Sequence, residues 1–296
     1  MTLQGFVQAL VSGIIMGGIY GLMALGLNLI FGVMRIINIA HGELMMLGMY
    51  VTYWLFVLFG LDPILSVLIV APLFFLLAPL IKRLLIDPIL KAGLRWGEAE
   101  FLILILTFGL STIFRNGALL VWKSDYRGIT TGYSTVPLTL AGISVSAGRL
   151  AAFLVAVLLS AGLFLFFART YTGKAIRATV QDEEAALLMG VNVDRISLVT
   201  FGLGVAVAAA AGSLLTLVIT FYPAVGGGFL LRSFCIIVLG GMGTAAGSVV
   251  GGLTLGLAEA LSAQVLDVAW TPVIAYLLLV IMLLVRPTGI LGRMRA

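Results

Sequence analysis

The chain has 296 residues, of which 62% are hydrophobic and only 10% are charged, and its mean hydropathy is +1.22. Soluble domains carry about 25% charged residues, so this composition excludes a soluble globular fold and makes lipid the solvent. The net charge of +5 does not indicate nucleic-acid binding, because the basic residues lie in loops between apolar segments, as the positive-inside rule predicts.

Nine apolar segments approach or exceed the roughly 20 residues that a membrane span needs. They cover residues 6–31, 37–59, 63–84, 100–121, 148–168, 196–220, 229–243, 245–263 and 269–285. The seventh is short, and the sequence GGMGT separates it from the eighth, so we expect this pair to be one broken or re-entrant element. The predicted fold is an all-α polytopic transmembrane helical bundle of about 8 spans, one of them broken. The N-terminus lacks a basic n-region, and we expect its long apolar run to stay in the mature protein.

The segment GLNLIFGVMRIINIAHGELMMLGMY, at the junction of the first two spans, carries the first candidate pathway residues. They are Asn28, Arg35, Asn38, His41 and Glu43, and polar or ionisable groups at membrane depth are functional candidates by default. In one continuous helix, Asn28, Arg35 and Asn38 would share a face. The alternative is a cytoplasmic turn in which Arg35 lies near the surface and pairs with Glu43. A lone histidine such as His41 is more often a hydrogen-bonded structural residue than a proton relay.

The orientation follows from the basic residues. Of the 17, 12 lie on one predicted side: Arg35, Lys82, Arg83, Lys91, Arg95, Arg169, Lys174, Arg177, Arg195, Arg286, Arg293 and Arg295. Four lie on the other side, Lys123, Arg127, Arg149 and Arg232, and Arg115 falls within or near a span. We therefore expect the N-terminus outside and the C-terminus inside, with the broken element counted as two crossings. The loop 123–148, rich in Ser, Thr and Gly, is then external and has some strand or turn content.

A polar island at 169–195 contains the densest cluster of charges. Residues 173–180 are expected to form a short turn of helix. Asp182 is expected to cap a second short helix, whose first turn carries Glu183 and Glu184 and which Gly190 ends. A plain solvated loop is the alternative, but it has no use for the apolar run AALLM. That run indicates a groove on a soluble partner.

Two glycine series repeat every four residues, Gly13, Gly17 and Gly21 in the first span and Gly243, Gly247 and Gly251 at the break. This spacing predicts close helix packing. The sequence carries no motif for ATP binding by a P-loop, for a zinc protease or for a nucleophilic serine, and one cysteine with one histidine argues against a metal site.

Four segments taken together, Gly26–Tyr50, Gly173–Ser197, GGMGTAAGSVVGG and RPTGILG, resemble the permease subunits of branched-chain amino-acid ABC importers, and most closely the first, shorter permease of the pair. The resemblance implies a single transmembrane permease domain over residues 1–296 in a bacterial inner membrane. It also implies a homologous second permease, two cytoplasmic ATPase subunits that bind the ATP, and a periplasmic substrate-binding protein. The chain itself would need no cofactor and would perform no covalent chemistry.

The same resemblance implies that the polar island carries a coupling helix that sits in a cleft of the ATPase. The expected coupling residues are Gly173, Lys174, Arg177, Asp182, Glu183, Glu184, Ala185, Leu188 and Gly190. The pathway candidates are Asn28, Arg35, Asn38, His41, Glu43, Gly243 and Gly247. Members of this family also carry urea and short-chain amides. A self-sufficient secondary transporter would need coupling-ion residues in several spans, yet acids in the later spans are nearly confined to Glu259. An intramembrane enzyme would have only His41 and Glu43.

Overall fold

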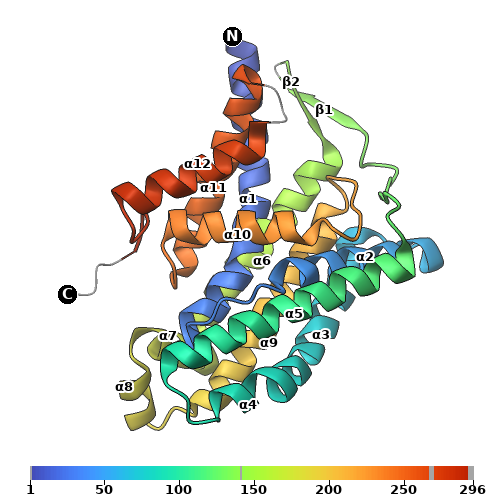
Figure 1. Cartoon of the computed structure of the whole chain (residues 1–296). Coiled ribbons are helices and arrows are strands. Elements are labelled where there is room, and N and C mark those ends of the chain that lie inside the picture. The colour runs from blue at the N-terminus through green and yellow to red at the C-terminus, as the bar shows by residue number, and fades with distance from the viewer. Residues whose placement is uncertain (1, 141, 267–269, 293–296) are drawn as a thin grey trace.

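The computed structural model describes residues 2–140, 142–266 and 270–292. Figure 1 shows that helices make up most of this part of the chain. The helices are α1 (Leu3–Met34), α2 (His41–Phe59), α3 (Pro63–Ile81), α4 (Asp87–Leu90), α5 (Trp96–Trp122), α6 (Ala147–Arg169), α7 (Tyr171–Gln181), α8 (Glu183–Leu188), α9 (Val193–Leu215), α10 (Gly226–Gly240), α11 (Ala245–Val265) and α12 (Thr271–Val285). A π-helical stretch, Lys82–Ile86, joins α3 to α4, and an antiparallel hairpin pairs β1 (Pro137–Leu140) with β2 (Ile143–Ser146).

The predicted all-α polytopic bundle is confirmed. Within the described residues, seven helical stretches are long and apolar enough to cross a membrane: α1, α2, the run Pro63–Leu90, α5, α6, α9 and α11. The helices α10 and α12 are apolar but shorter. The two residues Arg293 and Arg295, and the predicted start of the last span at position 269, lie outside the described part of the chain.

Predicted span boundaries differ from the structure, notably at the start of the second span and the end of the sixth. The second span does not begin at 37, because α1 ends at Met34, Arg35 follows in a left-handed conformation with φ 52°, and residues 35–40 form no helix. The sixth span does not reach 220, because α9 ends at Leu215. Beyond it, Phe221 exchanges two 2.8 Å backbone hydrogen bonds with Arg127 of the predicted external loop. Apolar composition alone could not locate either end, since both loops are themselves apolar.

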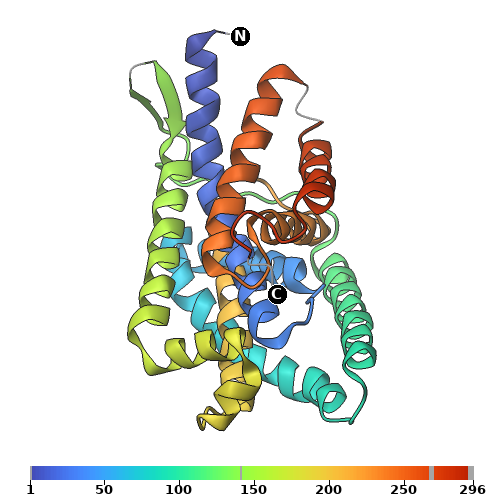
Figure 2. The same cartoon turned by 90° about the vertical axis from the view of Figure 1, so that its left-hand side faces the viewer.

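The two ends of the molecule carry different structures (Figures 1 and 2). At one end the hairpin lies against the start of α1, where Gln4 and Gln8 donate 2.7 Å hydrogen bonds to the carbonyl oxygens of Gly142 and Ser144. The opposite end holds α4, α7 and α8. The loops predicted to be cytoplasmic, 82–95 and 169–195, therefore lie together and away from the N-terminus and the hairpin.

The first glycine series packs α1 against α11. A Cβ atom on Gly17 would lie 2.8 Å from Leu253 Cα, and one on Gly13 would lie 2.9 Å from Leu257 Cα. The contact is reciprocal, since a Cβ atom on Gly252 would lie 2.6 Å from Gly21 Cα. No real side chain tolerates such distances, so the backbones touch, as the four-residue spacing predicts.

The sidedness can be tested by labelling single cysteines from outside the cell in a Cys235→Ala background. Cysteine at position 130, which is exposed beside the hairpin, should react with an impermeant maleimide, and cysteine at the exposed position 183 should not. Permeabilised cells provide the control, because both positions should then react. Strong labelling at 183 with none at 130 in intact cells would reverse the orientation.

Candidate functional site

The seventh and eighth predicted spans form a broken element. The helix α10 ends at Gly240 and α11 begins at Ala245. Gly241 and Gly243 in the turn have φ values of 112° and 80°, which only glycine adopts readily. Gly243 is therefore required for its backbone conformation, whereas Gly247 is required for close packing, because a Cβ atom there would lie 2.6 Å from the Gly240 carbonyl oxygen. The two glycines predicted to act alike have different roles.

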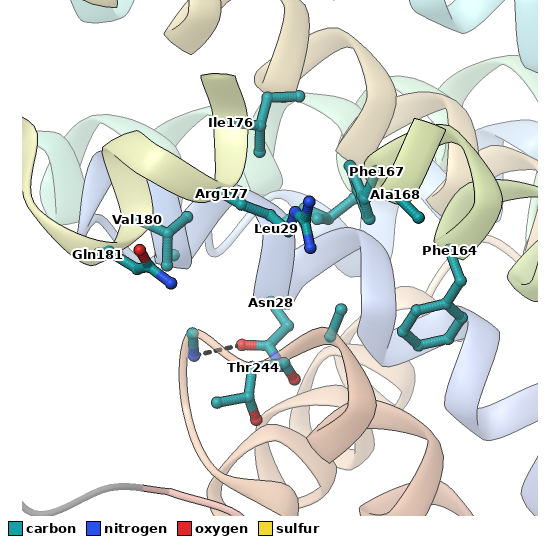
Figure 3. Close-up of a pocket in the computed structure, with 13 residues that line it drawn as sticks. Asn28, Leu29, Phe164, Phe167, Ala168, Ile176, Arg177, Val180, Gln181 and Thr244 are labelled. Carbon is teal, nitrogen blue, oxygen red and sulfur yellow. Dashed lines mark hydrogen bonds between the residues drawn. The ribbon is translucent and has the colours of Figure 1, made fainter. Parts of the chain in front are cut away.

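The side chain of Asn28 on α1 forms hydrogen bonds with the turn (Figure 3). Its Nδ2 donates to the Thr244 carbonyl oxygen at 2.7 Å and to Ser248 Oγ at 2.8 Å, and its Oδ1 accepts from the Gly243 amide at 2.6 Å. One side chain thus pairs two backbone groups of the turn and the Ser248 hydroxyl in the first turn of α11. The most direct role of this pathway candidate is to hold the broken backbone in place.

The segment that follows α12 also closes the break. The Ile290 amide donates to the Leu239 carbonyl oxygen at 2.8 Å, and the Leu291 amide donates to the Gly240 carbonyl oxygen at 3.0 Å. The RPTGILG motif therefore supplies backbone donors to the last carbonyl groups of α10, which have no partner within their own helix.

A cavity of about 680 Å³ lies between the turn and α7. Figure 3 shows α1, α6, α7 and the turn around it. Its walls are mostly apolar, with Phe164 and Phe167 from α6 and Val180 from α7. Arg177, a predicted coupling residue, and Asn28 and Gly243, two pathway candidates, line the same cavity. The structure therefore brings part of the polar island next to the broken element.

The polar island forms two short helices, α7 and α8. Thr170 Oγ1 accepts from the Gly173 amide at 3.0 Å and caps α7, and Asp182 Oδ1 accepts from the Ala185 amide at 3.0 Å and caps α8. Gly173 is buried where a Cβ atom would strike the Phe166 carbonyl oxygen, so α7 packs tightly on α6. Gly190 ends the unit with φ 83°.

An exposed apolar tip, Leu187, Leu188 and Met189, projects from this unit with 53%, 89% and 85% of each residue exposed. The charged residues Lys174, Glu183 and Glu184 are also exposed around it. Three consecutive exposed apolar residues, at the end of the molecule that holds α4 and α7, are typical of a surface that binds a partner.

The remaining pathway candidates are Arg35, Glu43, Asn38 and His41. Arg35 is exposed at the end of α1, so the interpretation of one continuous helix that aligns it with Asn28 and Asn38 is wrong. The alternative charge pair does not form either, because Glu43 is buried and its Oε1 accepts a 3.4 Å hydrogen bond from Ser111. Asn38 Oδ1 accepts from the Ala40 amide, and His41 Nε2 lies 3.1 Å from the Met23 carbonyl oxygen.

A polar cluster that the sequence analysis did not identify joins three helices. Glu259 on α11 is buried, and its Oε2 accepts from the Tyr20 hydroxyl at 2.8 Å. Its Oε1 accepts from Arg232 Nε on α10 at 3.0 Å. The sequence had placed Arg232 on the external side, within the predicted span 229–243, without a partner. The signal was present, because a lone acid in an apolar span requires a partner.

Comparison with known proteins gives one consistent result. Residues 9–284 match a family described as "Branched-chain amino acid transport system / permease component". The high-affinity branched-chain amino acid transport system permease protein BraD of Pseudomonas aeruginosa is 33% identical over 97% of this chain and 96% of its own. The corresponding permease protein LivH of Escherichia coli is 32% identical, with the same coverage. The solved structure of PsaBC from Streptococcus pneumoniae in complex with Fab aligns with a TM-score of 0.40 and 14% identity, over 96% of this chain and 91% of that one.

The close α10–α11 contact predicts that Gly247→Ala lowers the melting temperature of the chain. The added methyl group would overlap the Gly240 backbone, and overpacking costs roughly 1–3 kcal/mol. The matched control is Gly162→Ala on α6, where a Cβ atom would meet no other atom within 4 Å. Thermal unfolding of the two purified variants measures the difference. Equal melting temperatures would show that the α10–α11 contact tolerates a side chain.

Proposed function

This chain belongs to the permease family of branched-chain amino acid transport systems, and from that membership we propose that it is the membrane-spanning subunit of an ABC importer that moves branched-chain amino acids inward. The observation that carries the proposal is the similarity to permeases of this kind over nearly the whole length of both chains. The seven apolar helices fit a multi-pass location, which we assign to the bacterial inner membrane.

The remaining components are part of the same proposal. Residues 1–296 form one permease domain that pairs with a homologous second permease. Two cytoplasmic ATPase subunits bind and hydrolyse the ATP, and a periplasmic binding protein delivers the substrate. The chain needs no cofactor and catalyses no covalent step. What supports this division of labour is the exposed apolar tip at 187–189, which a chain without a soluble partner has no reason to present.

We place the contact with the ATPase on α8 and the coupling residues around it. The helix is short, its first turn is acidic, and it ends in the exposed apolar tip. The preceding helix α7 packs on α6 and lines the cavity beside the broken element. Movement of α8 by the ATPase would therefore be transmitted through α7 to the turn at 241–244, and the cavity leaves space for that movement.

Reconstitution tests the transport function. Proteoliposomes that contain this chain, the second permease and the ATPases should take up leucine, isoleucine or valine when the binding protein and ATP are present. Uptake of urea or acetamide in place of these amino acids would contradict the substrate assignment. Uptake by this chain alone, without ATPases, would identify a secondary transporter instead.

The docking role of α8 predicts the effect of Leu188→Asp. A carboxylate placed in an apolar groove costs about 2 kcal/mol or more, which corresponds to roughly 30-fold weaker binding of the ATPase. The variant should remain folded in the membrane, because Leu188 is 89% exposed, but it should lose the ATPase on copurification and lose transport. Leu188→Met keeps an apolar side chain and serves as the control. Normal transport by Leu188→Asp would remove α8 from the docking surface.

A further inference from the structure

The helix α2 begins inside the bundle, not at its edge. Its first residue, His41, lies against the Met23 carbonyl oxygen, and Met23 is about 30 Å along α1 at 1.5 Å per residue. Residues 35–40 lead into it without helical structure. The start of α10 meets it there, since a Cβ atom on Gly42 would strike the Gly226 carbonyl oxygen. Irregular backbone and helix ends at this depth are typical of places where transport proteins contact their cargo.

Polar side chains recur on α5 at four-residue spacing, Thr107, Ser111 and Arg115, and the first two contact this region. Thr107 Oγ1 accepts from the Ile39 amide at 3.3 Å, and Ser111 Oγ donates to Glu43 Oε1 at 3.4 Å. Residues four apart lie on one helix face, so Arg115 continues the row by one turn. Arg115 therefore lies about one helical turn from Ser111, whose hydroxyl binds Glu43.

The Glu43 carboxylate has one unused oxygen. The residue is only 2% exposed, and Oε2 has no hydrogen-bond partner among the described residues. The Glu259 carboxylate, by contrast, has both oxygens paired. A buried acid with an unpaired oxygen is costly, and such a group in a membrane protein marks a functional site.

Few residues of α5 are buried against the rest of the chain, and Arg115 on this helix is exposed. Figure 2 shows its upper turns at one edge of the bundle. Only about a sixth of its most apolar stretch is buried (17%), against 78% for α1. A guanidinium on the exposed face of a span is costly in lipid, so this face fits a partner subunit or a water-filled route.

We propose, on the basis of the transport function proposed above, that Glu43 and Arg115 are substrate-contacting residues that recognise the two charges of a zwitterionic α-amino acid. Glu43 Oε2 accepts a hydrogen bond from the α-ammonium group, and the Arg115 guanidinium donates to the α-carboxylate. Ser111 holds the other oxygen of Glu43 and so aims the free one. A neutral cargo such as urea would leave both charges of the site unpaired, so the same geometry selects amino acids over amides.

The test uses the complete importer in proteoliposomes, with leucine-loaded binding protein at saturation. Glu43→Gln and Arg115→Gln should each lower leucine uptake about ten-fold or more, the usual consequence of losing one charge-assisted contact. Glu43→Asp and Arg115→Lys should retain more uptake because the charge remains. Complex yield and stimulation of ATP hydrolysis by the binding protein should stay at wild-type values. Arg149→Gln, which removes an exposed charge at the start of α6, should have no effect.

Wild-type uptake in both Gln variants would overturn the site. So would losses that follow complex yield or ATP hydrolysis, because these indicate a structural role. If the buried Glu43→Gln variant does not assemble, the exposed Arg115 variants decide the question. These outcomes differ from failure of the transport function itself, which would appear as a wild-type importer that moves urea and no leucine.

Discussion

The structure depends on one constraint, that no backbone polar group can remain unpaired inside an apolar medium. Unbroken helices meet it by themselves. Within the described residues, this chain departs from them at residues 35–40 and at the turn 241–244, and each departure is paired from elsewhere in the sequence. Asn28 bonds to the second break from α1, and the segment 290–291 bonds to the end of α10. At residues 35–40, the Ile39 amide donates a hydrogen bond to the Thr107 hydroxyl of α5.

These long-range partners tie the helices into a mechanical unit. The turn at 241–244 is held by α1, which also packs along α11 through glycine contacts. The cavity beside the turn is bounded by α6 and α7, and α7 continues into the exposed tip of α8. The exposed tip of α8 and the turn at 241–244 are therefore connected through α7 and the cavity that α7 lines. Such an arrangement suits a chain whose interior is moved from outside, since a packed core without free space cannot change shape at low cost.

The sequence predicts the structure correctly where the signal is local. Apolar length predicts the long helices, four-residue glycine spacing predicts that α1 packs closely on another helix, and Asp182 followed by two glutamates predicts the cap of α8. It does not predict contacts whose partner is distant in the chain. No local pattern indicates that Asn28 reaches Gly243, that Arg232 reaches Glu259, or that Ser111 reaches Glu43. The apolar residues among 37–40 also concealed the start of α2, because hydropathy does not measure backbone conformation.

The two buried acids, Glu43 and Glu259, differ in how completely their carboxylates are hydrogen-bonded, and this difference indicates which one has a structural role. Glu259 is paired on both oxygens with groups from α1 and α10, and an ion pair of this kind fixes the relative position of three helices. Glu43 is equally buried, but among the described residues only one of its oxygens is hydrogen-bonded. It lies next to α5, a helix with little of its surface packed against the rest of the chain. Apolar composition treats both residues alike, as rare charges in a hydrophobic sequence. The unpaired oxygen of Glu43 distinguishes the two residues. A carboxylate whose hydrogen-bond partners are all present has a structural explanation, and one whose partner is missing points to a ligand.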